Sequence, residues 1–182
     1  MNTSENRKVI LYIACSLDGF IAAQNDDLSF LSIVEKQDED YGYSDFINSV
    51  DTVIMGRKTY DKVLTLVEQF PHADKKCFII TKTEKQAENN IIFYNQDLTQ
   101  LIEKLKAENG KNIFVDGGAE IVNELIRLRL IDEFYISIIP CILGNGTRLF
   151  KEQNPYRDLE LLSAKSFETG LVQLHYQSKF KQ

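Results

Sequence analysis

Two short stretches carry residue types suited to binding an anion. In the first, Gly56-Arg57-Lys58-Thr59 places a glycine, two cations and a hydroxyl directly after the apolar run 51–55. The pattern that follows predicts a helix beginning there, and a helix N-terminus presents free N–H groups and a positive partial charge. Cations are normally unfavourable at that position, and a bound phosphate offsets the repulsion. The alternative is that both cations simply lie in solvent.

The second stretch, Gly117-Gly118-Ala119-Glu120, follows the apolar run 112–115 and precedes a helical pattern of apolar residues over 121–130. Adjacent glycines lack Cβ atoms, so a ligand can approach the backbone beside the first helical turn. The motif is not the GxGxxG of a Rossmann site, and a tight turn without a ligand explains it equally well by itself. Thr81-Lys82-Thr83 adds hydroxyls and a cation at a third predicted strand end.

The elements that must position these residues follow from the spacing of apolar side chains. Strands are expected at 8–16, 51–55, 75–83, 91–94, 112–115 and 134–143, where Pro140 indicates a bend or an edge. A loop with a helical turn is expected at 24–43, and helices at 41–50, after 57, after the N-cap Asp97, and over 121–130. The tail predicts a hairpin of 159–167 and 171–180. One α/β domain over 1–182 follows, with a largely parallel sheet and an antiparallel edge.

Composition excludes several classes of protein. The 43% hydrophobic and 26% charged content is typical of a globular protein, and the net charge of −6 argues against a nucleic-acid partner. The polar residues 1–8 lack the apolar core of a signal peptide, and the run 134–143 is too short to span a membrane. We therefore expect a cytoplasmic protein with no membrane partner.

The cysteines and histidines do not form a metal site or a catalytic triad by spacing. Cys15, Cys77 and Cys141 are far apart, lie in apolar runs and are expected to be buried reduced thiols. His72 and His175 are isolated, and a structural or surface role is expected for each. No metal ligands are predicted.

Together these stretches identify the chain as similar to a known family. Met55-Gly56-Arg57-Lys58-Thr59-Tyr60 and Val115-Asp116-Gly117-Gly118-Ala119 resemble the dihydrofolate reductase-like superfamily. Three further segments resemble its riboflavin-biosynthesis reductase (RibD C-terminal domain) branch, in the form of a stand-alone member: Ser16 to Ala22, Leu130 to Glu133, and Pro140 to Gly146. The likeness runs from about Lys8 to Phe180, and it implies the three-layer dihydrofolate reductase-like fold with an antiparallel C-terminal hairpin.

The resemblance also implies NADPH as cofactor and assigns its contacts. Gly56 and the adjoining Arg57, Lys58 and Thr59 match the positions that meet the 2′-phosphate and the diphosphate. Thr81, Lys82 and Thr83 match the strand end that holds the adenosine part, and Gly117, Gly118, Ala119 and Glu120 match the diphosphate-binding turn. Ala14 and the loop around Asp18 would flank the nicotinamide.

For the reaction, the resemblance implies hydride transfer to a bound pterin- or pyrimidine-type heterocycle, as in a dihydrofolate or 5-amino-6-(5-phosphoribosylamino)uracil reductase. Asp40 falls on the acidic position of the dihydrofolate reductases, although the acids around it make a solvated surface role an alternative. A catalytic carboxylate there would need partial burial. The family also forms homodimers, and the apolar run 134–143 fits that expectation.

The chain departs from its relatives in three ways. True dihydrofolate reductases carry a Pro-Trp pair where this chain has Leu28-Ser29-Phe30-Leu31, and the chain contains no Trp, so folate is doubtful as substrate. It also lacks the zinc deaminase domain of bifunctional riboflavin enzymes. A basic pocket for a sugar phosphate is not evident, although Arg148 is a candidate. A nucleotide-binding sensor without catalysis, or a purely structural domain, are the competing hypotheses.

Overall fold

The computed structural model describes residues 7–83, 85–152 and 154–179, and their strands form one large sheet. Its order is β5-β4-β3-β6-β1-β7-β10-β9. The strands are β1 (Val9–Ser16), β3 (Val50–Gly56), β4 (Lys76–Ile80), β5 (Ile91–Tyr94), β6 (Asn112–Gly117), β7 (Glu133–Ile139), β9 (Leu159–Ser166) and β10 (Val172–Ser178). The short strands β2 (Phe20–Ala22) and β8 (Thr147–Arg148) pair separately.

Strand direction agrees with the sequence-based prediction. The strands from β5 to β7 are mutually parallel, whereas β10 runs antiparallel to both β7 and β9. The mostly parallel sheet with an antiparallel C-terminal hairpin is thus confirmed. Because parallel strands end at the same edge, the carboxyl ends of β3, β6, β1 and β7 lie together.

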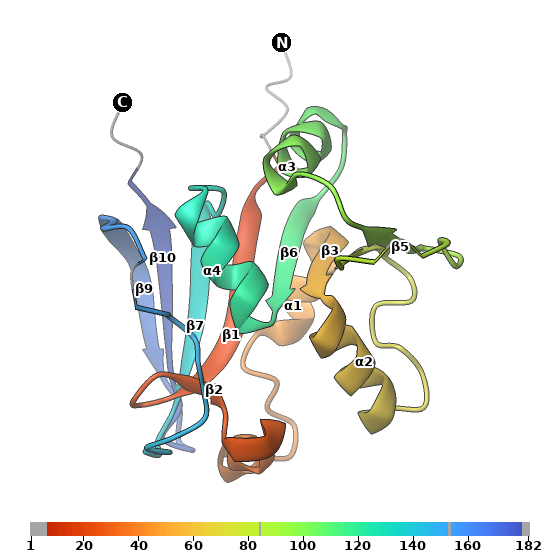
Figure 1. Cartoon of the computed structure of the whole chain (residues 1–182). Helices are drawn as coiled ribbons and strands as arrows, with labels where there is room; N and C mark the ends of the chain where they lie inside the picture. Colours follow the sequence, from red (N-terminus) through yellow and green to blue (C-terminus); the bar gives the residue numbers. More distant parts are fainter. Residues whose placement is uncertain (1–6, 84, 153, 180–182) are drawn as a thin grey trace.

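Helices cover both faces of the sheet and complete the three layers. On one face, α3 (Leu98–Ala107) and α4 (Ala119–Arg127) bury their apolar stripes against the strands, and Figure 1 shows α4 in front of the sheet. On the other face, α1 (Tyr43–Asn48) and α2 (Arg57–Leu66) contribute Phe46 and Tyr60 to a second core. The 3₁₀ helices η1 (Gln24–Asp26) and η2 (Ser29–Val34) form the helical turns expected within 24–43.

Local signals explain several element boundaries. The Asp97 carboxylate accepts a hydrogen bond from Gln100 N at 2.9 Å, which confirms the predicted N-cap of α3. Two expected strands were too long. Strand β7 ends at Ile139 rather than residue 143, because Pro140 has no N–H to continue the ladder. Strand β4 ends at Ile80 rather than residue 83, after which Thr81 N still donates to Tyr94 O.

Strand β7 also lies inside the sheet, between β1 and β10. Most of its apolar side chains are buried in the core. Ile142, just beyond β7, is 73% exposed, and three further exposed apolar residues, Leu159, Leu161 and Leu162, lie on the edge strand β9.

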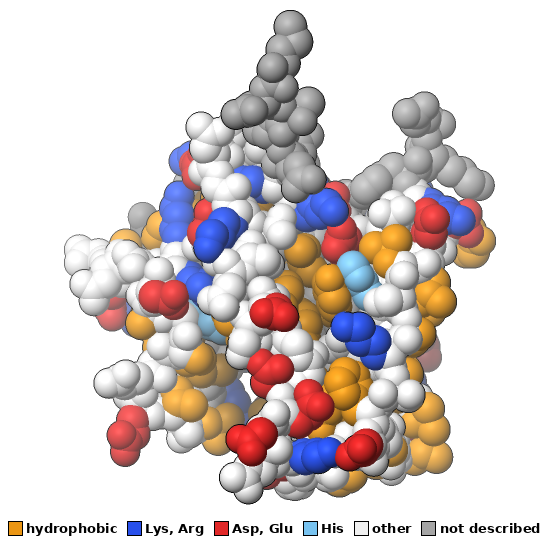
Figure 2. Space-filling model, turned by 180° about the vertical axis from the view of Figure 1, so that it is seen from behind, with side chains coloured by type: hydrophobic (Ala, Val, Ile, Leu, Met, Phe, Trp, Pro, Cys, Tyr) orange, Lys and Arg blue, Asp and Glu red, His pale blue; other side chains and the backbone are white. Residues whose placement is uncertain are grey.

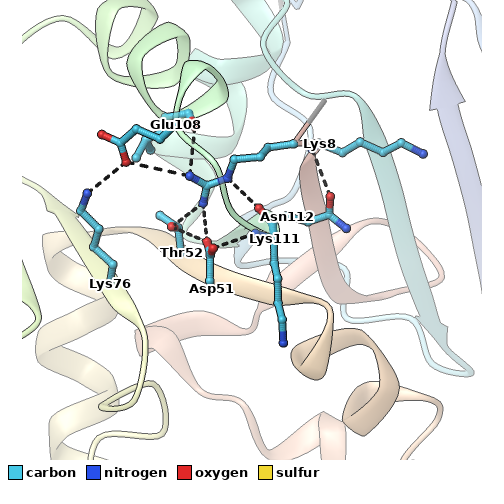
Figure 3. Close-up of polar contacts among 9 residues, drawn as sticks. Lys8, Asp51, Thr52, Lys76, Glu108, Lys111 and Asn112 are labelled. Carbon is cyan, nitrogen blue, oxygen red and sulfur yellow. Dashed lines mark hydrogen bonds and ion pairs between the residues drawn. The ribbon is translucent and has the colours of Figure 1, made fainter. Parts of the chain in front are cut away.

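A buried arginine, Arg7, holds the amino-terminal edge of the sheet together. Figure 3 shows three of its partners, Asp51, Thr52 and Lys111, lying close together. The Arg7 side chain is 4% exposed and forms an ion pair with Asp51. It also donates from Nη2 to Thr52 Oγ1 at 2.8 Å, from Nη1 to Leu105 O at 3.0 Å, and from Nε to Lys111 O at 2.6 Å. These contacts tie β3, α3 and the segment before β6 to the start of β1, at the edge opposite the candidate site.

Among the residues described, no helix is long and apolar enough to cross a membrane. Cys15 and Cys77 are buried as expected, whereas Cys141 is half-buried; all three are free thiols. His72 is buried between Phe70 and Phe114, and His175 stacks on Tyr135 and pairs with Glu133 at 2.8 Å, so both have structural surroundings.

Candidate functional site

The two glycine-bearing helix starts lie against each other. Strands β3 and β6 are neighbours, with Met55 opposite Gly117, so the N-termini of α2 and α4 leave the same edge of the sheet. A Cβ on Gly118 would lie 2.8 Å from Thr59 Oγ1, closer than real Cβ contacts. Gly117 has φ of +124°, a conformation that side-chain-bearing residues avoid. The contact leaves no room for a side chain where the resemblance implies a diphosphate.

Cations surround these helix starts. Glu120, at the first turn of α4, accepts a hydrogen bond from Lys151, and this bond, together with the charges of Lys151, Lys58 and Lys82, lowers the pKa of Glu120. Lys58 from α2 and Lys82 from the end of β4 are exposed. Segments far apart in the sequence thus place three lysines around one carboxylate.

Arg57 extends this basic region toward β5. Its Nε donates to the Asp61 carboxylate at 2.7 Å, and its guanidinium lies 5.4 Å from the centre of the Phe93 ring. Lys85 lies over the same ring at 4.5 Å. Sequence reasoning missed Phe93 and Lys85, although Phe93 lies near the end of a predicted strand. The arrangement offers a flat aromatic surface beside cations.

The end of β4 completes the basic half of the site. Thr83 N donates to Thr81 Oγ1 at 3.2 Å, which turns the chain directly after the strand. Lys82 and Thr83 are exposed, so their side chains are accessible to a ligand.

Asp18 contacts the backbone of its own chain. Its carboxylate accepts hydrogen bonds from Ser16 Oγ at 2.6 Å, Leu143 N at 3.0 Å and Gly144 N at 2.7 Å. These bonds, the Ser16 hydroxyl first, lower the pKa of Asp18 to about 2. The ionised side chain therefore holds the loop after β1 against the loop after β7. Its role toward a cofactor would be to position the loop after β1.

A pocket of about 510 Å³ opens beside this loop, on the face covered by α1. Ala14 lines it, as do Tyr12, Leu31, Val34, Glu35, Lys36, Gln37, Glu39, Asp40, Tyr41, Tyr43, Ser137, Ile139 and Leu171. On this face, seen from behind in Figure 2, acidic side chains gather over the lower part with hydrophobic side chains exposed beside them. The residues that line the pocket are largely aromatic and apolar, which is typical of sites that bind flat organic ligands.

A neutral hydrogen-bond network lies between β1, β7 and β10 at this pocket. Gln173 is 7% exposed, and its Nε2 donates to Tyr12 Oη at 2.9 Å and Ser137 Oγ at 3.2 Å. Tyr12 Oη in turn donates to Tyr41 O at 3.1 Å. Sequence reasoning missed these residues. Tyr12 could have been predicted, because it lies two residues before Ala14 and so on the same face of β1. No pattern in the sequence indicated Ser137 or Gln173.

Asp40 lies at the pocket but is exposed rather than partly buried. Its carboxylate accepts hydrogen bonds from Gly42 N at 2.9 Å and Ser44 N at 3.0 Å. A hydrogen bond from the Ser44 side chain and these backbone bonds lower the pKa of Asp40. The group is an anion at neutral pH, which suits accepting a hydrogen bond rather than donating a proton.

Tyr43 is the neutral donor that faces the same pocket. Tyr43 is 36% exposed, but loss of hydration around its partly covered phenol, followed by the charge of Asp116, raises the pKa of Tyr43 to about 12, so its phenol keeps its proton throughout the physiological range. The ring meets Tyr12 edge-on, with centroids 5.7 Å apart.

Comparison with known proteins agrees with this architecture. The chain is 43% identical over 171 residues to the uncharacterized protein YwjB of Bacillus subtilis (strain 168), covering 93% of this chain and 97% of that protein. A putative riboflavin biosynthesis protein from Shewanella sp. PV-4 superimposes with a TM-score of 0.87 at 30% identity, covering 95% of this chain and 99% of that one. The dihydrofolate reductase of Enterococcus faecalis, solved with NADP(H), gives a TM-score of 0.64 at 12% identity over 95% of this chain and 97% of that one, which shows a shared fold.

The three-layer dihydrofolate reductase-like fold is therefore confirmed. The model of the RibD C-terminal domain matches residues 7–173. The chain belongs to the RibD C-terminal domain family.

Proposed function

We propose that the chain is an NADPH-dependent reductase that transfers hydride to a pterin- or pyrimidine-type ring held in the pocket beside Ala14. The observation that carries the proposal is the meeting of two sites at one edge of the sheet. The paired helix starts of α2 and α4 lie at the ends of β3 and β6, and the aromatic pocket lies on the adjoining β1 and β7. Strands β6 and β1 are neighbours in the sheet, so the end of β6 lies beside the strand that carries Ala14.

The residues present fit a dinucleotide phosphate. In the part of the chain that the structure describes, neither the start of α2 nor the start of α4 is capped by a hydrogen bond from its N-cap side chain, so their first N–H groups are available to a phosphate. Arg57 and Lys58 would meet the phosphates of the cofactor, and the strand end at 81–83 would hold its adenosine part. Bound there, the reduced nicotinamide would supply the hydride.

The pocket residues would orient the acceptor ring. Tyr43 would offer an aromatic surface to a flat ring, for which ring stacking is favourable, whereas Tyr12 already stacks on Phe46 with ring centroids 4.4 Å apart. The anionic Asp40 would accept a hydrogen bond from a ring N–H or amino group. Tyr43 would donate a hydrogen bond to a ring heteroatom that gains negative charge as hydride arrives.

Calorimetric titration with NADPH and with NADH tests the cofactor site. We expect micromolar NADPH binding, weaker NADH binding, and loss of most of that preference in Arg57→Ala, because bidentate guanidinium contacts suit a phosphate. Lys104→Ala is the matched control, since Lys104 is an exposed cation on α3. Absence of binding by either nucleotide would rule out the reductase proposal.

Turnover separates the enzyme from the nucleotide-binding sensor. NADPH oxidation should be measured with a panel of oxidised pterins and pyrimidines, with Tyr43→Phe as the pocket variant. Oxidation that depends on both substrate and Tyr43 supports catalysis. Tight NADPH binding without oxidation of any ring compound supports the sensor function.

A further inference from the structure

The charged side chains that line the pocket are mostly of one sign. Glu35, Glu39 and Asp40 are acidic, and Lys36 is the one cation among the described residues that line the pocket. Glu39 Oε1 accepts a hydrogen bond from Tyr41 N at 2.8 Å, which holds that carboxylate at the pocket.

The cation at the pocket is already paired. Lys36 Nζ donates to Glu168 Oε2 at 2.5 Å, and this contact raises the pKa of Lys36 and lowers the pKa of Glu168. The pair is exposed and so contributes little to stability. Its effect at the pocket is to bring a further carboxylate beside the only lysine there.

Two backbone N–H groups near the pocket already have an anionic partner. The N–H groups of Gly42 and Ser44, at the start of α1, donate to the Asp40 carboxylate. Arg148, a sequence-based candidate for a sugar phosphate, stacks on Phe20 at 4.6 Å and does not line the pocket. Among the described residues, the polar side chains that β1, β7 and β10 place at the pocket are the neutral groups of the Gln173 network.

The basic side chains gather in the other half of the site. Lys58, Lys82 and Lys151 surround Glu120, and Arg57 lies beside Phe93, all around the ends of β3, β4 and β6. Phosphate recognition uses guanidinium and ammonium groups or free helix N-termini. The cations that could bind phosphate therefore lie where the cofactor is proposed to bind. The pocket proposed for the acceptor ring carries negative charge instead.

Resting on the proposed function, we propose that the substrate of this chain is a flat heterocycle without a phosphate group, neutral or cationic, that carries N–H or amino donors. Four carboxylates at or beside the pocket repel a phosphate dianion and attract donors. The reaction that supplies this substrate must therefore deliver a dephosphorylated or never phosphorylated ring. This separates the chain from a reductase of 5-amino-6-(5-phosphoribosylamino)uracil.

A matched pair of probes tests this charge selection. 5-Amino-6-(ribitylamino)uracil and its 5′-phosphate ester differ only in the phosphate, and their binding is measured anaerobically by calorimetry at low and high salt. We expect the unphosphorylated compound to bind at least about tenfold more tightly at low salt, with a smaller ratio at high salt because ions screen exposed charges. The ratio should fall in the double variant Glu35→Gln/Glu39→Gln, which removes two of the four carboxylates and whose amides keep the shape and the Tyr41 contact.

Three outcomes would overturn the inference: equal binding of the two compounds, preference for the phosphate ester, or no binding of either at millimolar concentration. Preference for the ester that disappears in Lys36→Met would identify Lys36 as a phosphate ligand. Thermal unfolding of each variant shows that it is folded.

NADPH titration of the same preparations distinguishes the two proposals. NADPH binding that depends on Arg57, combined with preference for the phosphate ester, refutes the substrate inference and leaves the reductase proposal standing. Preference for the unphosphorylated compound without NADPH binding refutes the reductase proposal and supports the charge selection of the pocket.

Discussion

Substituting Gly118 by Ala tests the contact between the two helix starts. The substitution should lower the free energy of unfolding when residue 59 is Thr, but not when residue 59 is Ala. Gly118 has φ of −75°, which Ala adopts without strain. Such a Gly→Ala change would by itself stabilise the fold by about 0.4–1 kcal/mol, through the unfolded chain. The new Cβ, however, would lie 2.8 Å from Thr59 Oγ1, and overpacking of this kind costs roughly 1–3 kcal/mol.

The net expectation for Gly118→Ala is a destabilisation of about 1–2 kcal/mol. Among the described residues other than the two chain neighbours of Gly118, Thr59 Oγ1 is the one atom within 4 Å of that Cβ. In a Thr59→Ala background the same change should therefore be neutral or stabilising by up to about 1 kcal/mol. The coupling between the two sites follows from the four proteins of a double-mutant cycle.

Urea unfolding followed by circular dichroism measures this cycle. With an m-value of about 2 kcal/mol/M, the single Gly118→Ala change lowers the midpoint by about 0.5–1 M. Equal destabilisation by Gly118→Ala in both backgrounds would refute the reasoning, because the cost would then not come from the Thr59 hydroxyl. Thr65→Ala is a matched background, since Thr65 is an exposed threonine on the same helix.

Three further predictions concern other parts of the molecule. Asp51→Ala should destabilise the fold by about 2–4 kcal/mol in urea unfolding, because it leaves the buried Arg7 guanidinium with only the more distant Glu108 carboxylate at 4.0 Å, whereas Asp61→Ala, at an exposed ion pair, should cost under about 1 kcal/mol. The pKa of Asp18 is about 2 in the folded protein and 3.8 for an ordinary aspartate, so its contribution to stability is present above pH 3.8 and is lost as pH falls toward 2. Asp18→Asn should remove that part of the pH dependence of the urea midpoint. If the chain forms a homodimer through β9, sedimentation equilibrium should show dimers at micromolar concentration and monomers for Leu161→Asp, since Leu161 is 52% exposed on that edge strand; a wild-type monomer would contradict it.

Much of the basic half of the site was predictable because its residues follow one another along the chain. Gly56 and Arg57 adjoin, as do Gly117 and Gly118, and each pair lies where an apolar strand pattern changes to a helical one. Asp97 was likewise recognisable as an N-cap from its neighbours alone. Helix starts and strand ends depend on short-range sterics and hydrogen bonds, which a local sequence carries.

The role of Asp18 shows where local reasoning stops. Asp18-Gly19 was recognisable as a turn, and the resemblance placed its loop near the nicotinamide, but its partners Leu143 and Gly144 lie 125 and 126 residues away. The carboxylate meets them only because β1 and β7 are neighbours with parallel carboxyl ends. Asp40 gives the opposite case, because its partners Gly42 and Ser44 are close in sequence and its capping role was open to prediction.

The sequence by itself determined the order of strands and helices, the antiparallel tail and the two glycine-bearing helix starts, since each depends on periodicity and on residues a few positions apart. Only the tertiary structure decided the pocket. Tyr12, Ser137 and Gln173 meet there because β1, β7 and β10 are adjacent in register, with Ala14 opposite Ser137 and Ser137 opposite Gln173. Strand order and register are set by the burial of the whole sheet, so no local pattern encodes which distant side chains share its face.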